Sequence, residues 1–271
     1  MPTLLLITAS SPEIRRVRRA RVLNFQQITM PYLAARVPPH WDVFHVDEEV
    51  ESINWKMHPD VVGITFHTPS AYHAYEIARH FRENGSCVVL GGPHVTLCPQ
   101  EAGQHAGAIF IGEAEGLWEQ FLKDWQAGSI QPVYQPADLP GLENIPMARK
   151  EFFHRRDHTN GVLFATRGCP NLCDFCTVAV MYRHTLRRRP VAEVAAEYAS
   201  FKGKVIIFWD DNLAADLGML GSYFMPSHLT GSGGAARPAC MPGGTRPSWK
   251  RPPAAAASSC SWAWNPSPNP A

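Results

Sequence analysis

The hydrophobic positions of the first 128 residues form short runs separated by longer amphipathic stretches. Short runs dominated by Val, Ile and Leu are typical of strands buried on both faces of a parallel sheet. The predicted strands are residues 3–7, 42–46, 60–65, 86–90 and 108–111. Helices are predicted at residues 25–36, 71–84 and 115–127. Strands that alternate with helices indicate a doubly wound, parallel α/β domain over residues 1–128.

The pattern changes after residue 128. Residues 129–160 lack a clear period and contain four prolines, so we interpret them as a linker. A strand is predicted at 161–166, a helix at 191–201 and a further strand at 205–209. Residues 161–217 therefore begin a second domain with a β-α-β unit. Residues 218–271 show neither a helical nor a strand period of apolar residues. They are rich in Pro, Gly, Ala and Ser, which indicates a disordered tail.

Composition narrows the classes of function. The formal net charge of the 271 residues is +1, which argues against nucleic acid or a membrane surface as the main partner. No apolar run reaches the roughly 18 residues that a membrane span needs. The N-terminal apolar run is too short for a signal peptide and follows no basic segment, so a cytoplasmic location is expected. Seven cysteines, three of them clustered, then favour metal binding over disulfides.

The clustered cysteines are Cys169, Cys173 and Cys176, in the spacing Cys-x3-Cys-x2-Cys directly after a predicted strand. Thiolates are soft ligands that suit iron–sulfur clusters, and three of them leave one iron of a four-iron cluster open. A structural zinc site is an alternative, because His184 could supply the fourth ligand that such a site needs. Three unrelated buried cysteines are a further alternative.

The segment Thr166-Arg167-Gly168-Cys169-Pro170 and the three-cysteine spacing resemble the signature of radical S-adenosylmethionine (SAM) enzymes, with Phe175 in the aromatic position before the last cysteine. The resemblance implies a partial (β/α)6 barrel whose first strand leads into a loop that holds a [4Fe–4S] cluster. It also implies that the open iron binds SAM, that an electron from the cluster cleaves SAM to a 5′-deoxyadenosyl radical, and that Phe175 lies against the adenine. Flavodoxin or ferredoxin is the electron donor that the family implies.

Two polar segments near this loop are further candidates. Asp210, Asp211 and Asn212 end the 205–209 strand, where family members often carry an acidic motif that holds the methionine ammonium of SAM. Helix capping is the alternative interpretation of these residues. The basic run is interpreted as a solvated face, with pairing to a SAM carboxylate as the alternative; it contains Arg183, Arg187, Arg188 and Arg189.

Three loops of the first domain follow predicted strands at their carboxyl ends, where doubly wound sheets bind ligands. The loop at 65–70 follows the third strand, and the phrases LGGPHVT and GEAEGLW follow the fourth and fifth. These phrases resemble the cobalamin-binding domain of one large radical SAM class, over about residues 1–217. The resemblance implies that cobalamin contacts come from Gly91, Gly92, Pro93, Thr96, Gly112 and Glu113.

One motif of the best-known cobalamin domains is missing. After the second strand the chain reads Asp47-Glu48-Glu49-Val50-Glu51 instead of Asp-x-His-x-x-Gly, whose histidine ligates cobalt. Many radical SAM members also lack it and hold cobalamin without a histidine ligand. We interpret His67, His73 and His94 as polar loop residues rather than ligands. A degenerate α/β domain that no longer binds a corrinoid is the alternative for the whole domain.

Two functions follow. The first is an enzyme that uses the cluster, SAM and cobalamin for methyl transfer or rearrangement at an unreactive carbon. The second is a truncated, non-catalytic protein that binds a corrinoid or a cluster, because only two barrel strands are recognisable. Truncation is suggested by residues 260–266, whose codons in another frame can encode Leu-Leu-Gly-Leu-Glu-Ser, a phrase that resembles a later barrel strand. We therefore expect a frameshift near residue 218.

Overall fold

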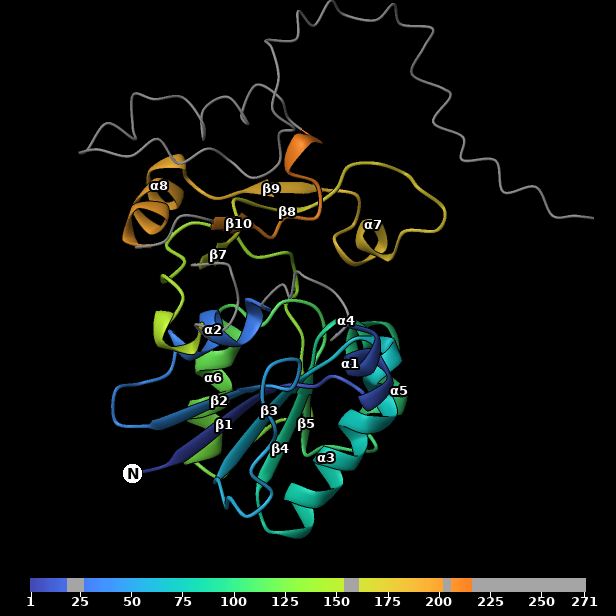
Figure 1. Ribbon diagram of the computed structural model, residues 1–271, viewed down its shortest axis with the longest axis vertical. Helices are drawn as coiled ribbons and strands as arrows, with labels where there is room; N and C mark the ends of the chain where they lie inside the picture. Colours follow the sequence, from blue (N-terminus) through green and yellow to red (C-terminus); the bar gives the residue numbers. More distant parts are fainter. Residues whose placement is uncertain (19–26, 154–160, 202–205, 216–271) are drawn as a thin grey trace, which may run out of the picture. The chain divides into compact units, whose positions relative to one another are not determined.

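The structure is a computed structural model and describes residues 1–18, 27–153, 161–201 and 206–215 (Figure 1). In the first part of the chain, six strands form one parallel sheet in the order β2-β1-β3-β4-β5-β6. The strands are β1 (Thr3–Thr8), β2 (Asp42–Asp47), β3 (Val61–Thr65), β4 (Cys87–Gly91), β5 (Ala108–Phe110) and β6 (Val133–Tyr134). The predicted doubly wound α/β fold is confirmed. The five predicted strands pair in the order 2-1-3-4-5, and β6 adds a sixth strand at the edge.

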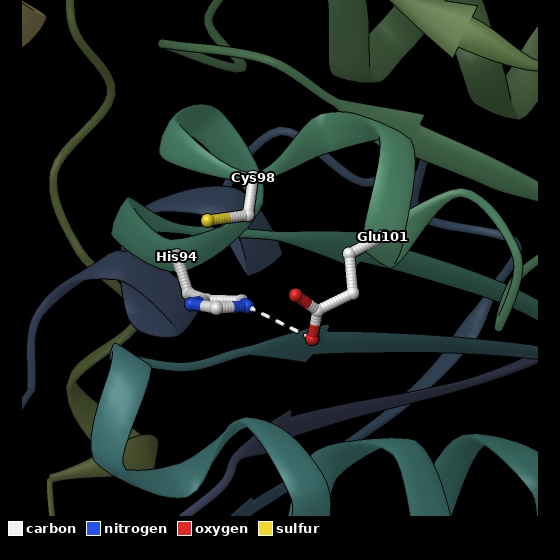
Figure 2. Close-up of side chains that lie close together, drawn as sticks. All are labelled: His94, Cys98 and Glu101. Atoms are coloured by element: carbon white, nitrogen blue, oxygen red, sulfur yellow. Dashed lines mark ion pairs between the residues drawn. The ribbon is translucent and has the colours of Figure 1, made fainter.

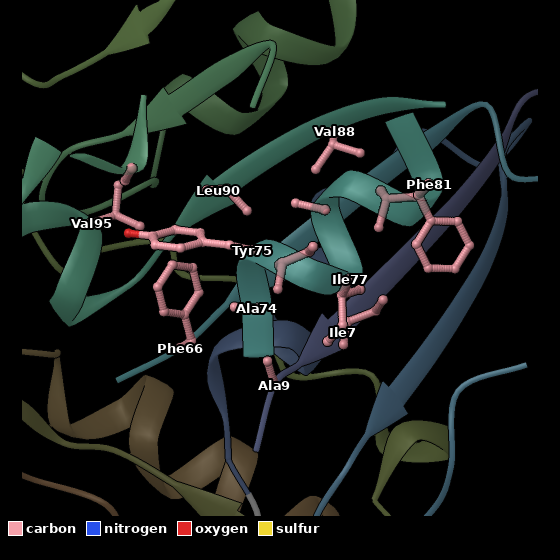
Figure 3. Packing of buried hydrophobic residues seen from close by; sticks show 14 of the residues in the cluster. Ile7, Ala9, Phe66, Ala74, Tyr75, Ile77, Phe81, Val88, Leu90 and Val95 are labelled. Atoms are coloured by element: carbon pink, nitrogen blue, oxygen red, sulfur yellow. The ribbon is translucent and has the colours of Figure 1, made fainter. Parts of the chain in front are cut away.

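Helices cover both faces of this sheet (Figure 1). Within β1, Leu5 and Ile7 pack in one cluster, whereas Leu4 and Leu6 pack in another, because successive side chains of a strand point to opposite faces. The first cluster, shown in Figure 3, includes side chains from α3 (Ala71–Glu83), α4 (Pro93–Leu97) and α5 (Pro99–Ala102). The second includes side chains from α2 (Thr29–Ala34) and α6 (Leu117–Gln126). A further helix, α1, spans Pro12–Arg18.

The helix predictions agree with the structure where the apolar period is long. The predictions for 71–84 and 115–127 correspond to α3 and α6 to within two residues. The prediction for 25–36 corresponds to α2, which is shorter, and its first two residues lie outside the described ranges. The short helices α4 and α5 were not predicted, because five and four residues are too few for a period to show.

The segment that we predicted to be a linker is packed against the rest of the protein. It contributes β6 to the sheet, and Leu142, Ile145 and Ala148 are buried in a third apolar cluster with Tyr32 and Phe164. A short 3-10 helix follows at Lys150–Phe152, and residues 154–160 lie outside the described residues. Two-residue strands and single buried apolar residues leave no periodic signal, which is why the sequence pattern missed this packing.

The second part of the chain contains the predicted β-α-β unit. Strand β7 (Gly161–Leu163) pairs in parallel with β10 (Ile206–Phe208), and helix α8 (Val191–Ser200) lies between them in the chain. An antiparallel hairpin of β8 (Thr166–Gly168) and β9 (Leu186–Arg188) was not predicted. It closes the segment that carries the three cysteines and the short helix α7 (Thr177–Met181).

The described residues end at a short 3-10 helix, Leu213–Ala215. The predicted disordered tail at 218–271 and the frameshift near residue 218 therefore lie outside the described residues. Among the helices that are described, none is both long and apolar enough to cross a membrane.

Candidate functional site

A cavity of about 570 Å³ opens at the carboxyl ends of the sheet strands. In a sheet of order 2-1-3-4-5, ligands bind outside the point where β1 and β3 diverge to opposite sides. The cavity lies at this point, because Thr8, Ala9 and Ser10 after β1 and Phe66 after β3 line it. Five of the residues predicted to contact cobalamin also line it, namely Gly91, Gly92, Pro93, Gly112 and Glu113. Residues from the second part of the chain complete the wall: Phe164, Thr166, Arg167, Met181, Tyr182, Trp209 and Asp211.

Gly92 is a position where only glycine fits. Its φ is +101°, and a Cβ atom built there would lie 2.6 Å from the Thr65 hydroxyl and 3.0 Å from backbone atoms of Phe66. Both the left-handed backbone and the close approach of the β3 loop therefore require a residue without a side chain. Gly92 thus brings the loops after β3 and β4 together at the edge of the cavity.

Thr96 does not line the cavity but joins two of the loops that do. Its hydroxyl donates to the Gly92 carbonyl at 3.1 Å and accepts from the Gly112 backbone N–H at 2.9 Å. The Thr96 side chain, which we predicted to contact cobalamin, thus fixes the loop after β4 to the loop after β5.

Glu113 is buried and its carboxylate faces two arginines of the second part of the chain. Arg187 donates to it from both terminal nitrogens, at 2.9 Å for the longer contact, and Arg167 lies 3.2 Å from it. Arg167 also pairs with Glu115 at 2.5 Å. Burial works to lower the pKa of Arg167, but Glu115 and Glu113 outweigh it and raise the pKa. This ion-pair network, hereafter the Glu113 clamp, joins the loop after β5 to the β8–β9 hairpin.

The prediction that three histidines lie in loops holds for His67 but is wrong for His73 and His94, which lie on α3 and α4. His67 is exposed and lines the cavity, and it is the one histidine among the described residues that line it. His73 lies 2.8 Å from the buried Glu48 carboxylate, which also accepts from the backbone of Ser10. His94 is buried and does not line the cavity.

The three cysteines lie on the loop that the β8–β9 hairpin closes. Gly168, immediately before Cys169, has φ +86°, and a Cβ atom there would lie 2.2 Å from the Thr185 carbonyl. The glycine of the Arg-Gly-Cys sequence is therefore required by the close approach of the two arms of the hairpin. All three cysteines are free thiols; Cys173 is exposed, and Cys169 and Cys176 are half-buried.

The three thiols do not meet the distance limit that ligands of one zinc ion require. Two sulfurs bound to one zinc lie at most about 4.6 Å apart, because each Zn–S bond is about 2.3 Å. In the described residues, Cys169, Cys173 and Cys176 do not belong to a group of three ligand atoms within 4.8 Å of one another. His184, the candidate fourth ligand, instead lies 3.4 Å from the Asn171 carbonyl through Nδ1.

The predicted Asp-Asp-Asn segment shapes the cysteine loop. Asp210 accepts hydrogen bonds from the backbone N–H groups of Ala165 and Thr166 and from the Thr166 hydroxyl at 2.6 Å. Asp211 accepts from the Gly168 backbone N–H at 2.8 Å. These bonds hold the strand end that leads into the cysteines. Asp211 also lines the cavity, whereas Asp210 does not.

Asn212 contacts a predicted cluster ligand directly. Its side-chain amide donates to the Cys169 sulfur at 3.2 Å. Hydrogen bonds to cluster sulfurs are one of the means by which proteins set cluster potentials. Phe175, predicted to lie against an adenine, is 91% exposed, so its ring is accessible to a ligand.

The interpretation of the basic run as a solvated face is wrong for two of its arginines. Arg187 belongs to the Glu113 clamp. Arg189 forms a buried ion pair with Glu197 at 2.6 Å, and the Tyr32 hydroxyl donates to the same carboxylate at 2.8 Å. Arg183 and Arg188 are exposed, as expected. A charge run in the sequence does not reveal which of its members meet buried carboxylates far along the chain.

Sequence reasoning missed three residues of this site, Arg167, Glu115 and Tyr182. Arg167 and Glu115 lie inside the quoted phrases, and their opposite charges were the available signal. Tyr182 lines the cavity, and burial, followed by nearby Asp211, raises its pKa to about 12. Its hydroxyl is therefore protonated near neutral pH and presents a hydrogen-bond donor.

The described residues thus combine a parallel sheet, which has a cavity at its carboxyl edge, with a β-α-β unit that carries a three-cysteine loop. No family model matches the chain. Its fold is similar to the solved structure of the cobalamin-dependent S-adenosylmethionine radical enzyme OxsB with aqua-cobalamin bound, at a TM-score of 0.56 and 14% identity. The match covers 78% of this chain and 34% of that one.

Two curated relatives come from Chlorobaculum tepidum. The chain is 39% identical over 152 residues to bacteriochlorophyllide d C-8(2)-methyltransferase and 30% identical over 166 residues to bacteriochlorophyllide d C-12(1)-methyltransferase. The alignments cover 53% and 57% of this chain but 34% and 36% of the relatives, so the chain spans about a third of their length. The predicted resemblance to the cobalamin-binding radical SAM family, which implies a [4Fe–4S] cluster, SAM and cobalamin, is confirmed.

Proposed function

We propose that this chain binds a [4Fe–4S] cluster, SAM and cobalamin and acts in methyl transfer to an unreactive carbon. The observation that carries the proposal is the Glu113 clamp, which joins the cysteine loop to the cavity at the sheet edge. When bound, the cluster would supply the electron that cleaves SAM, and cobalamin would carry the methyl group. The relatives are methyltransferases, which favours methyl transfer over rearrangement.

Each part of the site has a separate role in this proposal. Cys169, Cys173 and Cys176 would hold the cluster, with one iron left for SAM. Gly112 would let the corrin ring approach the backbone closely, because a Cβ atom built there meets only Pro136, at 3.9 Å, whereas Gly92 would hold the loops after β3 and β4 together. Because the Glu113 clamp is largely buried, it would keep the two cofactor loops at a constant separation. The cavity is lined both by the loops after β4 and β5 and by Thr166 and Asp211 beside the cysteine loop, which supports a ligand site between these segments.

Phe175 and Asp211 are the candidates for SAM contacts. The exposed Phe175 ring is free to stack on an adenine, and Asp211 lines the cavity beside the cysteine loop. We propose that Asp211 and Asn212 serve both the loop and SAM, while Asp210 acts as a positioning residue for Thr166. An electron donor such as flavodoxin or ferredoxin would reduce the cluster from the exposed side of the cysteine loop.

The test is anaerobic reconstitution of the full chain with iron and sulfide. We expect about four iron and four sulfide per chain, reductive cleavage of SAM to 5′-deoxyadenosine, and binding of hydroxocobalamin. Replacement of Cys176 by Ala is expected to abolish SAM cleavage. The matched control is Cys87→Ala, because Cys87 lies on β4 and burial raises the pKa of its thiol, which keeps it unreactive.

The results separate the two functions of the chain. Cluster assembly with SAM cleavage supports the enzyme. Cobalamin binding or cluster assembly without SAM cleavage supports a non-catalytic corrinoid- or cluster-binding protein. Wild-type protein that holds no sulfide-bridged iron would refute the cluster assignment.

A further inference from the structure

Helices α4 and α5 bring three different metal-ligating side chains together (Figure 2). His94 lies on α4, Cys98 lies between the helices and Glu101 lies on α5. One ligand atom from each lies within 4.8 Å of the other two. Among the described residues, this is the one group of three His, Cys, Asp or Glu side chains that meets this distance.

The local backbone explains why these side chains converge. Pro93 and Pro99 begin the two helices, as proline favours at a first helical position. Cys98 ends α4 with φ −128° and ψ 57°, and its backbone N–H donates to the His94 carbonyl at 2.8 Å. The change of direction at Cys98 turns Glu101 back toward His94, so that His94 Nε2 lies 3.7 Å from Glu101 Oε1.

We infer that His94, Cys98 and Glu101 form a binding site for a thiophilic divalent cation, with zinc as the expected metal. Imidazole nitrogen, thiolate sulfur and carboxylate oxygen are all zinc ligands. Nitrogen and oxygen ligands of one zinc lie at most about 4.3 Å apart, because each bond is about 2.0–2.2 Å. The separation of 3.7 Å between His94 and Glu101 is within this limit.

The surroundings of His94 match those of a metal ligand. Its Nδ1 lies 3.1 Å from the Thr68 hydroxyl, an oxygen that can accept the ring N–H and leave the Nε2 lone pair facing the other two ligands. The Tyr75 hydroxyl, 3.1 Å from Nε2, would give up this contact when a cation binds. Binding would release the thiol proton of Cys98 to solvent.

The site is open on one side and separate from the cobalamin-side cavity. The His94 side chain is 5% exposed and forms the inner wall, whereas the Glu101 side chain is 49% exposed, so a cation can enter from solvent. Pro93 lines the cavity, but His94, Cys98 and Glu101 do not. A bound cation would therefore fix α4 to α5 directly behind the loop after β4, without taking part in the cysteine-loop chemistry.

The test is a Co²⁺ titration of the full chain in which Cys169, Cys173 and Cys176 are replaced by Ser, so that these thiols cannot compete. We expect one Co²⁺ per chain, with a sulfur-to-metal charge-transfer absorption that Zn²⁺ abolishes by displacement. Adding Cys98→Ser should remove this absorption, whereas adding Cys87→Ser should leave it unchanged. Because Glu101 is half exposed, Glu101→Gln should fold normally and bind Co²⁺ at least about tenfold more weakly.

In the protein that carries only the three serine replacements, Zn²⁺ should also raise the melting temperature. The increase should be larger than in the protein that carries Cys98→Ser as well. A Co²⁺ spectrum without a thiolate band, or a band that survives Cys98→Ser, overturns the proposal. Cys240 and Cys260 are present in every variant, so they do not affect the comparison. The outcome is independent of the proposed function, because the cluster cysteines are absent from all proteins in the titration.

Discussion

The two described parts of this chain position their ligand loops by different means. The strands β1 to β4 are five or six residues long and are packed between helices by apolar side chains on both faces. Strands β7 to β10 are three residues long, and beside the small apolar clusters around β7 this part contains the buried Arg189–Glu197 ion pair. Two-stranded sheets bury little apolar surface by themselves, so the geometry of the second part depends more on individual polar contacts.

The largest loss of stability that this comparison predicts is for substitution of Glu197. Glu197→Ala should lower the free energy of unfolding by about 3–5 kcal/mol, because Arg189 would keep a buried charge without its partner. The joint change of Arg189→Met and Glu197→Leu should recover most of this loss. Urea unfolding followed by tryptophan fluorescence and circular dichroism measures the difference.

The matched control is Glu193→Ala on the same helix. Glu193 accepts one hydrogen bond, from the Asn144 backbone N–H at 2.9 Å, at a site open to solvent, so its loss should cost about 1 kcal/mol or less. If Glu197→Ala were no more costly than Glu193→Ala, the second part would not depend on the buried pair.

The stability of the first part should depend on close packing of the backbone rather than on buried charges. Substitutions at two glycines test this expectation. Gly85 and Gly92 both have positive φ, but a Cβ atom at Gly85 meets nothing within 4 Å. Gly85→Ala should cost about 1–2 kcal/mol for the left-handed backbone alone. Gly92→Ala should cost about 1–3 kcal/mol more, because its Cβ would overlap the β3 loop.

Hydroxocobalamin binding provides a second test of the same two glycine substitutions. Gly92→Ala should weaken binding, since the loops after β3 and β4 must separate, whereas Gly85→Ala should leave the dissociation constant unchanged. Equal stability losses in the two variants would contradict the close approach at Gly92.

A smaller effect is expected for the polar contact to Cys169. Asn212→Ala removes a hydrogen-bond donor from a cluster sulfur and should lower the midpoint potential of the reconstituted cluster. A net hydrogen-bond energy of about 0.5–1.5 kcal/mol corresponds to about 20–65 mV for one electron. A redox titration monitored by electron paramagnetic resonance measures the shift, with iron content as the control for cluster loading. An unchanged potential at full loading would show that the contact does not affect the cluster.

The last expected effect is a pH dependence of the second part. Burial raises the pKa of Asp210 from 3.8 to about 6, against the opposing effect of hydrogen bonds from Thr166 and Ala165. The folded protein then holds this proton more tightly than the unfolded chain does. The stability contribution is fully present below about pH 4 and is lost as the pH rises to about 6.

Unfolding free energies measured from pH 4 to 7 in the wild type and in Asp210→Asn test this expectation. The variant should lack the decrease that the wild type shows over the window below the raised pKa of about 6. Identical pH profiles for the two proteins would contradict a raised pKa.

Local patterns predicted the main elements and the chemistry-bearing loops. Strands β1 to β5 of the first sheet, helices α3 and α6, and the β-α-β unit follow from apolar periods within single segments. The cavity-lining positions Gly91, Gly92, Gly112 and Glu113 follow from their place after predicted strands. The short pieces β6, α4, α5 and the β8–β9 hairpin were missed because two to five residues cannot show a period.

The sequence by itself determined the alternation of strands and helices, the order of the loops and the three-cysteine spacing, because each depends on neighbours along the chain. Only the tertiary structure decided what the polar side chains of those loops contact. Glu113 meets Arg187 across 74 positions, and Asn212 meets Cys169 across 43. Such pairs depend on how separate elements pack in space, and no local period of apolar residues encodes that packing.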